Sequence, residues 1–355
     1  MELSTVWFVI IGVLWTGYFV LEGFDFGVGI LLPFLGGRKR SAIEAPPTPA
    51  DAEVEKRRRV MLNTIGPVWD GNEVWVLTAG GATFAAFPHW YATMFSGFYL
   101  ALLLILVALI VRNLGFDYRH KRPHESWKRR WDVAVFWGSL VPAFLWGVAL
   151  TSVVLGVPID ADKEFTGNLL TLLGPTSLLG GLTFVALFVT HGAIFVALKT
   201  DGPIRADARR VAARVGLPTA GLAVVLLFLL GLHGGDAASW ITTVLAAAAL
   251  VVGLWFNLKD REGMAFIGTA ATIALAVATY FLILFPNVMP STTDPAFSLT
   301  TANASSSHYT LTIMTVVALV FTPIVLLYQG WTYWVFRKRL TTQHIPADVV
   351  LEHAH

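Results

Sequence analysis

Long runs of uncharged, apolar residues are the feature of this sequence that most limits how the chain can fold. A helix needs roughly 20 such residues to cross the hydrocarbon core of a bilayer. The runs that reach or approach this length are Leu3–Leu21, Val74–Val111, Val133–Ile159, Leu169–Leu198, Val215–Gly235, Ala237–Leu258, Met264–Thr293 and Ala296–Phe336. No single soluble core could bury so many long segments. The sequence therefore predicts an all-α, polytopic membrane protein.

The run from Val74 to Val111 is too long for one spanning helix. Pro88 lies inside it, and proline disfavours continuation of a helix, so we expect two helices here. The first of them must begin before Val74 and include Asp70 and Glu73. We therefore expect nine spanning helices in a single integral membrane domain, residues 1–355. Only 14% of the residues are charged, against about 25% in a soluble domain, which agrees with this class.

The positions of the basic residues predict the orientation of these helices. With nine spans, every Lys and Arg except Lys163 falls on one side of the membrane. Basic loops face the cytoplasm, so the N-terminus is expected outside and the C-terminus in the cytoplasm. Membrane topology explains this alternation of basic loops, so we expect no nucleic-acid binding, and in the lipid bilayer the loops can also hold anionic head groups. The Pro- and Ala-rich segment Ser41–Glu55 is expected to be a flexible cytoplasmic linker.

Four acids are predicted at membrane depth. Glu22 and Asp25 follow the first apolar run, and Asp70 and Glu73 precede the second. The i, i+3 spacing places both members of each pair on one helix face. Ionisable groups inside a membrane are costly and commonly functional, so we expect these carboxyl groups to form a proton path from the cytoplasm. The alternative is that they cap helices or pair with Arg112 or with a partner chain.

The sequence offers little to hold a cofactor. It contains no cysteine, which excludes thiolate ligands for a metal or haem. His191 is the histidine that lies within a predicted span, and a second histidine at similar depth is not found. We therefore expect His191 to be a packing residue, and expect this chain to bind neither haem nor metal.

Several segments resemble one family in the same order along the chain. The sequence resembles subunit II of cytochrome bd-type quinol oxidases, above all in the Trp-Asp-Gly-Asn-Glu-Val-Trp segment that begins at Trp69. The matching segments are Gly23–Gly29, Trp69–Trp75, Thr78–Pro88, Phe95–Tyr99, Gly115–Arg119, Phe285–Ser291 and Leu326–Gln329.

The resemblance implies a non-haem subunit of an electrogenic terminal oxidase in the cell membrane of a bacterium or archaeon. Its non-covalent partner, subunit I, carries two b-type haems, one d-type haem and the quinol-oxidising site. The complex oxidises quinol and reduces O2 to water in aerobic respiration. This chain would scaffold subunit I, contribute a cytoplasmic proton path and not be catalytic alone. It would fold as two four-helix bundles plus one peripheral helix. Some members also hold a structural quinone or small accessory single-span subunits.

The resemblance also implies roles for individual residues. Asp70 and Asp25 match the acids of the family's proton path, and Arg112 and Asp117 match residues near its cytoplasmic mouth. Trp75 matches a tryptophan beside an O2 route that is described for some members.

A free-standing, proton-coupled transporter is the alternative function. Transporters commonly carry matching sites in two structural repeats near the membrane midplane. The predicted buried acids lie only in the first half of this chain, which favours the oxidase subunit.

Overall fold

The computed structural model describes residues 2–37 and 49–345, and most of them are helical. The long helices are α1 (Leu3–Leu35), α2 (Pro49–Ile65), α3 (Trp69–Ala86), α4 (Pro88–Gly97), α5 (Tyr99–Tyr118), α6 (Glu125–Leu155), α7 (Pro175–Lys199), α8 (Pro203–Gly234), α9 (Ala237–Leu258), α10 (Glu262–Leu284) and α11 (His308–Val335). The short elements are the 3₁₀ helices η1 (Leu169–Leu172), η2 (Pro295–Phe297) and η3 (Thr342–His344), and the antiparallel strands β1 (Asn287–Met289) and β2 (Leu299–Thr300).

Eight of the described helices are long and apolar enough to cross a membrane. They are α1, α5, α6, α7, α8, α9, α10 and α11. Helix α3 is the remaining member of the nine that were predicted, and Asp70 and Glu73 in its first turns keep it below the hydropathy that each of the other eight reaches over a stretch of the same length. It ends at Ala86 and α4 begins at Pro88, where the break was expected. The predicted all-α, polytopic membrane fold is confirmed.

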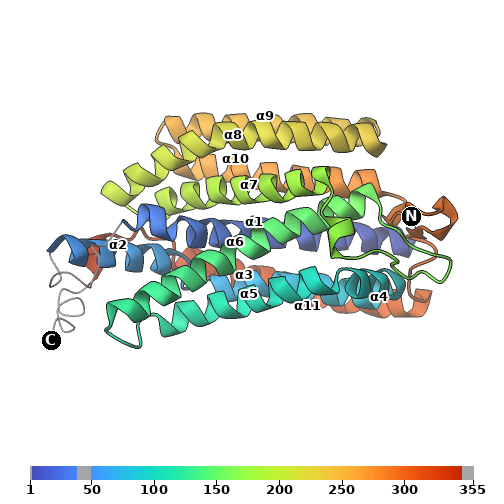
Figure 1. Ribbon diagram of the computed structural model, residues 1–355, viewed down its shortest axis with the longest axis horizontal. Helices are drawn as coiled ribbons and strands as arrows, with labels where there is room; N and C mark the ends of the chain where they lie inside the picture. Colours follow the sequence, from blue (N-terminus) through green and yellow to red (C-terminus); the bar gives the residue numbers. More distant parts are fainter. Residues whose placement is uncertain (1, 38–48, 346–355) are drawn as a thin grey trace.

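The long helices pack as two groups with one outlying member (Figure 1). In the first group α7 contacts α8, α8 contacts α9, α9 contacts α10 and α10 contacts α7. In the second, α1 contacts α3 and α6, and α6 contacts α5. Helix α1 joins the groups, because it also packs on α7 and α10. Helix α11 contacts α3 and α1 and is otherwise exposed. This arrangement agrees with the expected two sets of four and one peripheral helix.

Aromatic side chains fill the space where α1 and α6 meet. The rings of Trp15 and Trp146 pack edge to face with centroids 4.9 Å apart, and Trp15 also stacks on Phe19. The indole of Trp146 donates a hydrogen bond to the Tyr18 hydroxyl at 3.2 Å. All of these side chains are buried. Because large aromatic surfaces interlock in this way, the registration of α1 against its neighbours is well defined.

The linker prediction is wrong for residues 49–55. These residues form the first turns of α2, and Glu55 is buried against Arg119. The Pro- and Ala-rich composition suggested a solvated segment, but ion pairing to a buried arginine holds this part of the chain as a helix. Residues 41–48 lie outside the described residues.

The glycines of α1 and of α3 differ in their surroundings. Gly23 and Gly27 face α7, where an added Cβ would lie less than 3 Å from atoms of Phe188. Gly71 and Gly81 of α3 have no described atom within 4 Å of such a Cβ. Close packing inside this chain therefore explains the α1 glycines and not those two α3 glycines.

Candidate functional site

Helices α1, α3 and α5 bring polar side chains together inside the second helix group. We define the acid cluster as Glu22 and Asp25 of α1, Asn72 and Glu73 of α3, and Arg112 of α5. Glu22, Asp25, Asn72 and Arg112 are buried, and Glu73 is half-buried. Each helix presents one face to the cluster, because residues three apart in a helix share a face.

Arg112 lies at the centre of the acid cluster. Its guanidinium Nη2 forms an ion pair with Glu22 and lies 3.6 Å from Glu73 Oε2. Asn113 donates a hydrogen bond to the same Glu73 oxygen at 2.6 Å, and the Phe26 ring centroid lies 4.8 Å from the guanidinium carbon. Glu22 and Glu73 therefore both pair with Arg112, which was the alternative to a proton path for these acids. In a low-dielectric interior such a pair is costly to break, because the remaining charge has no counter-ion.

Asp25 has a different environment from Glu22. Its Oδ2 accepts a hydrogen bond from Asn72 Nδ2 at 2.7 Å, and no cation among the described residues lies within ion-pair distance of it. Asp25 Oδ1 and Glu22 Oε2 are both buried and have no hydrogen-bond partner in the described chain. Buried polar atoms are nearly always partnered, so these two carboxyl oxygens are exceptions among the described residues.

Helix α11 reaches the acid cluster from outside. Tyr333 donates a hydrogen bond from its hydroxyl to Asn72 Oδ1 at 2.7 Å, and Gln329 contacts the same oxygen at 3.3 Å. Trp75 of α3 donates from Nε1 to Gln329 Oε1 at 2.8 Å. The outlying helix therefore contributes polar groups to the site although it buries little of its own surface.

Two predicted site residues lie outside the acid cluster. Asp70 and Asp117 are exposed, and neither forms an ion pair with another described residue. Asp70 precedes Glu73 by one turn of α3, and Asp117 follows Asn113 by about one turn of α5. Both therefore lie on the side of the cluster toward one end of the helix array. We call this the basic end, because it holds the arginines Arg58, Arg119, Arg205 and Arg339.

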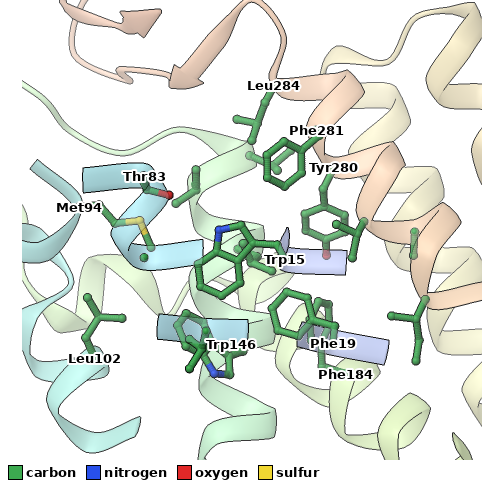
Figure 2. A pocket seen from close by; sticks show the side chains of 18 of the residues that line it. Trp15, Phe19, Thr83, Met94, Leu102, Trp146, Phe184, Tyr280, Phe281 and Leu284 are labelled. Atoms are coloured by element: carbon green, nitrogen blue, oxygen red, sulfur yellow. The ribbon is translucent and has the colours of Figure 1, made fainter. Parts of the chain in front are cut away.

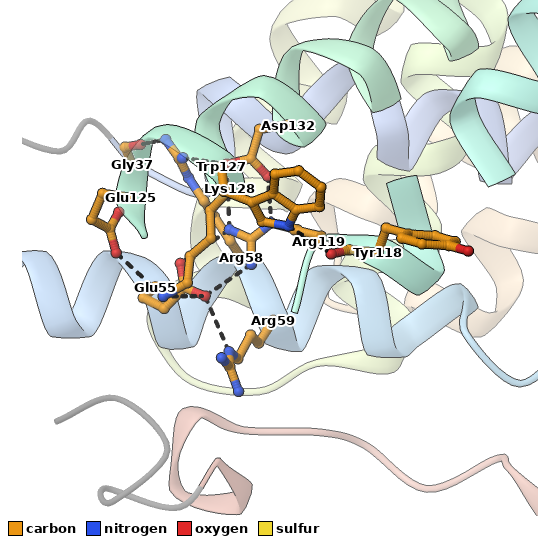
Figure 3. Close-up of polar contacts among 10 residues, drawn as sticks. All are labelled: Gly37, Glu55, Arg58, Arg59, Tyr118, Arg119, Glu125, Trp127, Lys128 and Asp132. Atoms are coloured by element: carbon orange, nitrogen blue, oxygen red, sulfur yellow. Dashed lines mark hydrogen bonds and ion pairs between the residues drawn. The ribbon is translucent and has the colours of Figure 1, made fainter. Parts of the chain in front are cut away.

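A buried ion-pair network at the basic end was not predicted (Figure 3). Arg119 donates from Nη1 to Glu55 Oε1 at 2.8 Å and from Nε to Asp132 Oδ1 at 2.6 Å. Arg58 donates to the second Asp132 oxygen at 2.7 Å. Burial opposes the charge on Arg119, but its bonds to Glu55 and Asp132 outweigh burial and raise the pKa of the guanidinium. No local pattern predicts this network, since its members come from α2, the end of α5 and α6.

An apolar cavity of about 80 Å³ lies between the two helix groups (Figure 2). Aromatic side chains dominate its wall, among them Trp15, Phe19, Trp146 and Phe184. Trp90 also lines it, and the Trp90 indole nitrogen is buried without a hydrogen-bond partner among the described residues. The apolar lining suits an apolar molecule.

The surroundings of His191 do not fit haem ligation. His191 is the buried histidine of the described chain, and both of its ring nitrogens are engaged. Nδ1 lies 2.7 Å from Thr269 Oγ1, and Nε2 lies 3.1 Å from the Val20 carbonyl oxygen. Its ring also stacks on Phe266 with centroids 4.6 Å apart. Neither nitrogen is free to bind iron, and the described residues contain no group of three or more potential metal ligands.

The fold and the site together define an integral membrane protein whose helices enclose carboxyl groups around a buried arginine. The sequence profile of the family described as cytochrome bd terminal oxidase subunit II matches residues 3–336. The chain is 40% identical over 346 residues to the cytochrome bd ubiquinol oxidase subunit 2 of Bacillus subtilis, covering 96% of this chain and 97% of that one. It is 37% identical over 382 residues to the cytochrome bd-I ubiquinol oxidase subunit 2 of Escherichia coli K12, covering 97% and 96%.

The fold has a counterpart among solved structures. A chain in the structure of bd oxidase from Geobacillus thermodenitrificans superimposes with a TM-score of 0.75 at 18% identity, covering 95% of this chain and 100% of that one. The chain described here belongs to the cytochrome bd terminal oxidase subunit II family. It is a subunit of a quinol oxidase complex, an oxidoreductase of the bacterial membrane. Family membership implies a complex with subunit I and haems within that complex.

Proposed function

We propose that the acid cluster carries protons from the cytoplasm toward subunit I, where O2 is reduced. One observation carries this proposal. Glu22 and Asp25 are buried one turn apart on α1, and each has a carboxyl oxygen without a partner in the described chain. The helical rise separates them by about 4.5 Å along the axis, a distance that one intervening water can bridge.

The path would begin at the basic end and run along α1. Asp70 and Asp117 are exposed there. Asp25 comes next, one turn closer to the basic end than Glu22. At each step an O–H bond forms on one carboxyl oxygen as the O–H bond of the preceding carrier breaks. Arg112 stabilises negative charge on Glu22 between transfers, because its guanidinium pairs with that carboxylate.

The orientation follows from the same proposal. The basic end would face the cytoplasm, which places the N-terminus outside and the C-terminus inside the cell. Basic residues at helix ends favour the cytoplasmic side. Arg58, Arg119, Arg205 and Arg339 gather at that end, and they support this assignment.

Scaffolding of subunit I is the second role we propose for this chain. Only 6% of the most apolar part of α11 is buried, and exposed apolar side chains also cover the outer faces of α3 and α5. These surfaces must contact lipid or another helix. Asp70 lies on the same outer surface, so a partner that covers α3 would lie beside the start of the proposed path.

Cofactors would be divided between the two chains. The engaged nitrogens of His191 support placing haem b and haem d on subunit I and not on this chain. The apolar cavity suits a structural quinone. A carbonyl oxygen of the quinone would accept a hydrogen bond from the unpartnered N–H of Trp90. Trp75, on the same helix as the cavity residues Val76 and Gly80, suits a route for O2 into it.

A free-standing, proton-coupled transporter is not favoured. Such a protein would need acids at matching depth in both helix groups. Among the described residues of α7, α8, α9 and α10, the one buried acid is Glu262, at the first residue of α10. It accepts a hydrogen bond from Arg205 at 2.7 Å, which is a helix-end ion pair and not a midplane site.

The proton path is tested by Asp25→Asn in the intact complex with subunit I. We expect quinol-driven O2 uptake to fall by about a hundredfold, the low end of what a proton-transfer group contributes. Assembly and haem absorption should be unchanged. Asp162→Asn is the matched control, because Asp162 is exposed at the opposite end of the helix array. Wild-type uptake in a fully assembled Asp25→Asn complex would exclude Asp25 from the path.

A further inference from the structure

The side-chain amide of Asn72 uses all of its hydrogen-bonding capacity. Its nitrogen donates to Asp25 Oδ2 at 2.7 Å and to the Leu21 carbonyl at 3.4 Å. Its oxygen accepts from the Tyr333 hydroxyl at 2.7 Å and from Gln329 Nε2 at 3.3 Å. An amide has two donor hydrogens and one oxygen with two acceptor sites, so none is left over. Asn72 is also completely buried and cannot exchange these partners for solvent.

Trp75 determines the orientation of the side-chain amides of Gln329 and Asn72. An indole N–H can only donate, and Trp75 Nε1 donates to Gln329 Oε1 at 2.8 Å. The amide nitrogen of Gln329 must then face Asn72, so Asn72 presents its oxygen there and its nitrogen to Asp25. If either amide were turned over, two N–H groups would oppose each other, and buried donors without acceptors are costly.

The Trp75 ring is held in place by α1. A Cβ added to Gly17 would lie 2.2 Å from atoms of this ring, so the indole lies directly on the α1 backbone. Asp25 is on the same helix, two turns further along. The donor that starts the chain of amides and the carboxyl group that ends it are therefore fixed relative to each other.

We propose that Trp75, Gln329 and Asn72 form a positioning chain for Asp25. The chain keeps an N–H donor on Asp25 Oδ2 and leaves Oδ1, the oxygen without a partner, as the atom that gains and loses the proton. The proposal rests on the proposed proton path, because it assigns the proton to one oxygen of a carrier in that path. Tyr333 supports the chain by occupying the second acceptor site of Asn72.

The charged and titratable groups around Asp25 would stay in place when the positioning chain is altered. They are Glu22 on α1, Glu73 on α3, Arg112 on α5 and Tyr333 on α11. His191 on α7 is turned toward Thr269 and the Val20 carbonyl. Turning the Asn72 amide therefore changes the hydrogen bond to Asp25 without changing the charges that face it.

Two substitutions in the intact complex test the positioning chain. Trp75→Phe removes the fixed donor but keeps an aromatic ring, and Gln329→Met removes the amide but keeps the side-chain length. The readouts are the pH profile of quinol-driven O2 uptake and the infrared carboxyl band that Asp25→Asn abolishes. A hydrogen bond to a carboxylate typically changes proton affinity by about tenfold, so we expect each variant to move the profile by about one pH unit.

The double variant adds a stricter criterion. Because both substitutions interrupt one chain, Trp75→Phe with Gln329→Met should move the profile and the carboxyl band no further than either alone. Trp255→Phe is the matched control, since Trp255 is half-exposed on α9 in the other helix group, and it should change neither readout.

The outcomes separate this proposal from the proton path. An unchanged pH profile and carboxyl band in both single variants would overturn the positioning chain, as would a change confined to the KM for O2. Wild-type O2 uptake in Asp25→Asn would overturn the proton path, while the carboxyl band would still report on the positioning chain. If Trp75→Phe does not assemble, Gln329→Met decides the question alone.

Discussion

Gly27 of α1 and Gly192 of α7 meet backbone to backbone. A Cβ added to Gly192 would lie 2.6 Å from the Gly27 Cα, and one added to Gly27 would lie 2.0 Å from the Phe188 carbonyl oxygen. Real Cβ atoms do not approach backbone this closely, so both positions need glycine. Asp25 precedes Gly27 by two residues and therefore lies close to this contact. The contact therefore sets how closely α1, which carries Asp25, approaches α7.

Gly27→Ala should destabilise the complex by forcing α1 and α7 apart. Overpacking costs about 1–3 kcal/mol, and the upper end applies because the clash is with backbone that cannot rotate away. The thermal midpoint of haem loss from the solubilised complex measures this. Gly221→Ala is the control, since an added Cβ meets nothing within 4 Å there. Equal midpoints for the two variants would contradict the close approach.

Arg112→Met should leave the buried Glu22 carboxylate without its counter-ion. Breaking a buried ion pair on one side costs about 3–5 kcal/mol, so a large loss of thermal stability is expected. The double variant with Glu22→Gln should recover much of the stability but not O2 uptake. Arg129→Met, at an exposed position, should have little effect. A double variant no more stable than Arg112→Met alone would show that Glu22 is not the group left unpaired.

Asp70→Asn should slow quinol-driven O2 uptake while subunit I and its haem spectrum remain. Asp70 is exposed at the basic end and forms no ion pair with a described residue, so the substitution removes a proton-exchanging group without disrupting packing. The expected loss is about a hundredfold or more. O2 uptake is measured on complexes whose subunit ratio has been verified. Failure to assemble would indicate a structural contact with the partner instead.

Asp236 should make the stability of α9 depend on pH. Its carboxylate caps the helix and accepts a hydrogen bond from the Ser239 amide at 2.8 Å, and this bond lowers the pKa of Asp236. Its contribution is then complete above the unfolded value of about 3.9 and is lost as pH falls through the folded pKa. Asp236→Asn keeps a cap that does not titrate. The difference in thermal midpoint between wild type and this variant should stay constant above about pH 5 and change below pH 4.

Local sequence patterns predicted the helices because hydrophobicity and helix breaks are read residue by residue. The break at Pro88 and the acids Glu22, Asp25 and Glu73 among the helices could be placed in this way. The role of Glu55 could not, because its helix is held by Arg119, which lies far away in the sequence. The contacts of Tyr333 and Gln329 with Asn72 could not be predicted either, because they form only when α11 packs against α3.

The sequence by itself determined the class of fold, the family and the acids that lie among the helices. Those properties depend on apolar run length, charge placement and local motifs. The tertiary structure alone decided which acid pairs with Arg112, which carboxyl oxygens stay without partners, and which glycines allow backbones to touch. Such contacts depend on the angle and register at which distant helices pack, and no pattern within one helix specifies these.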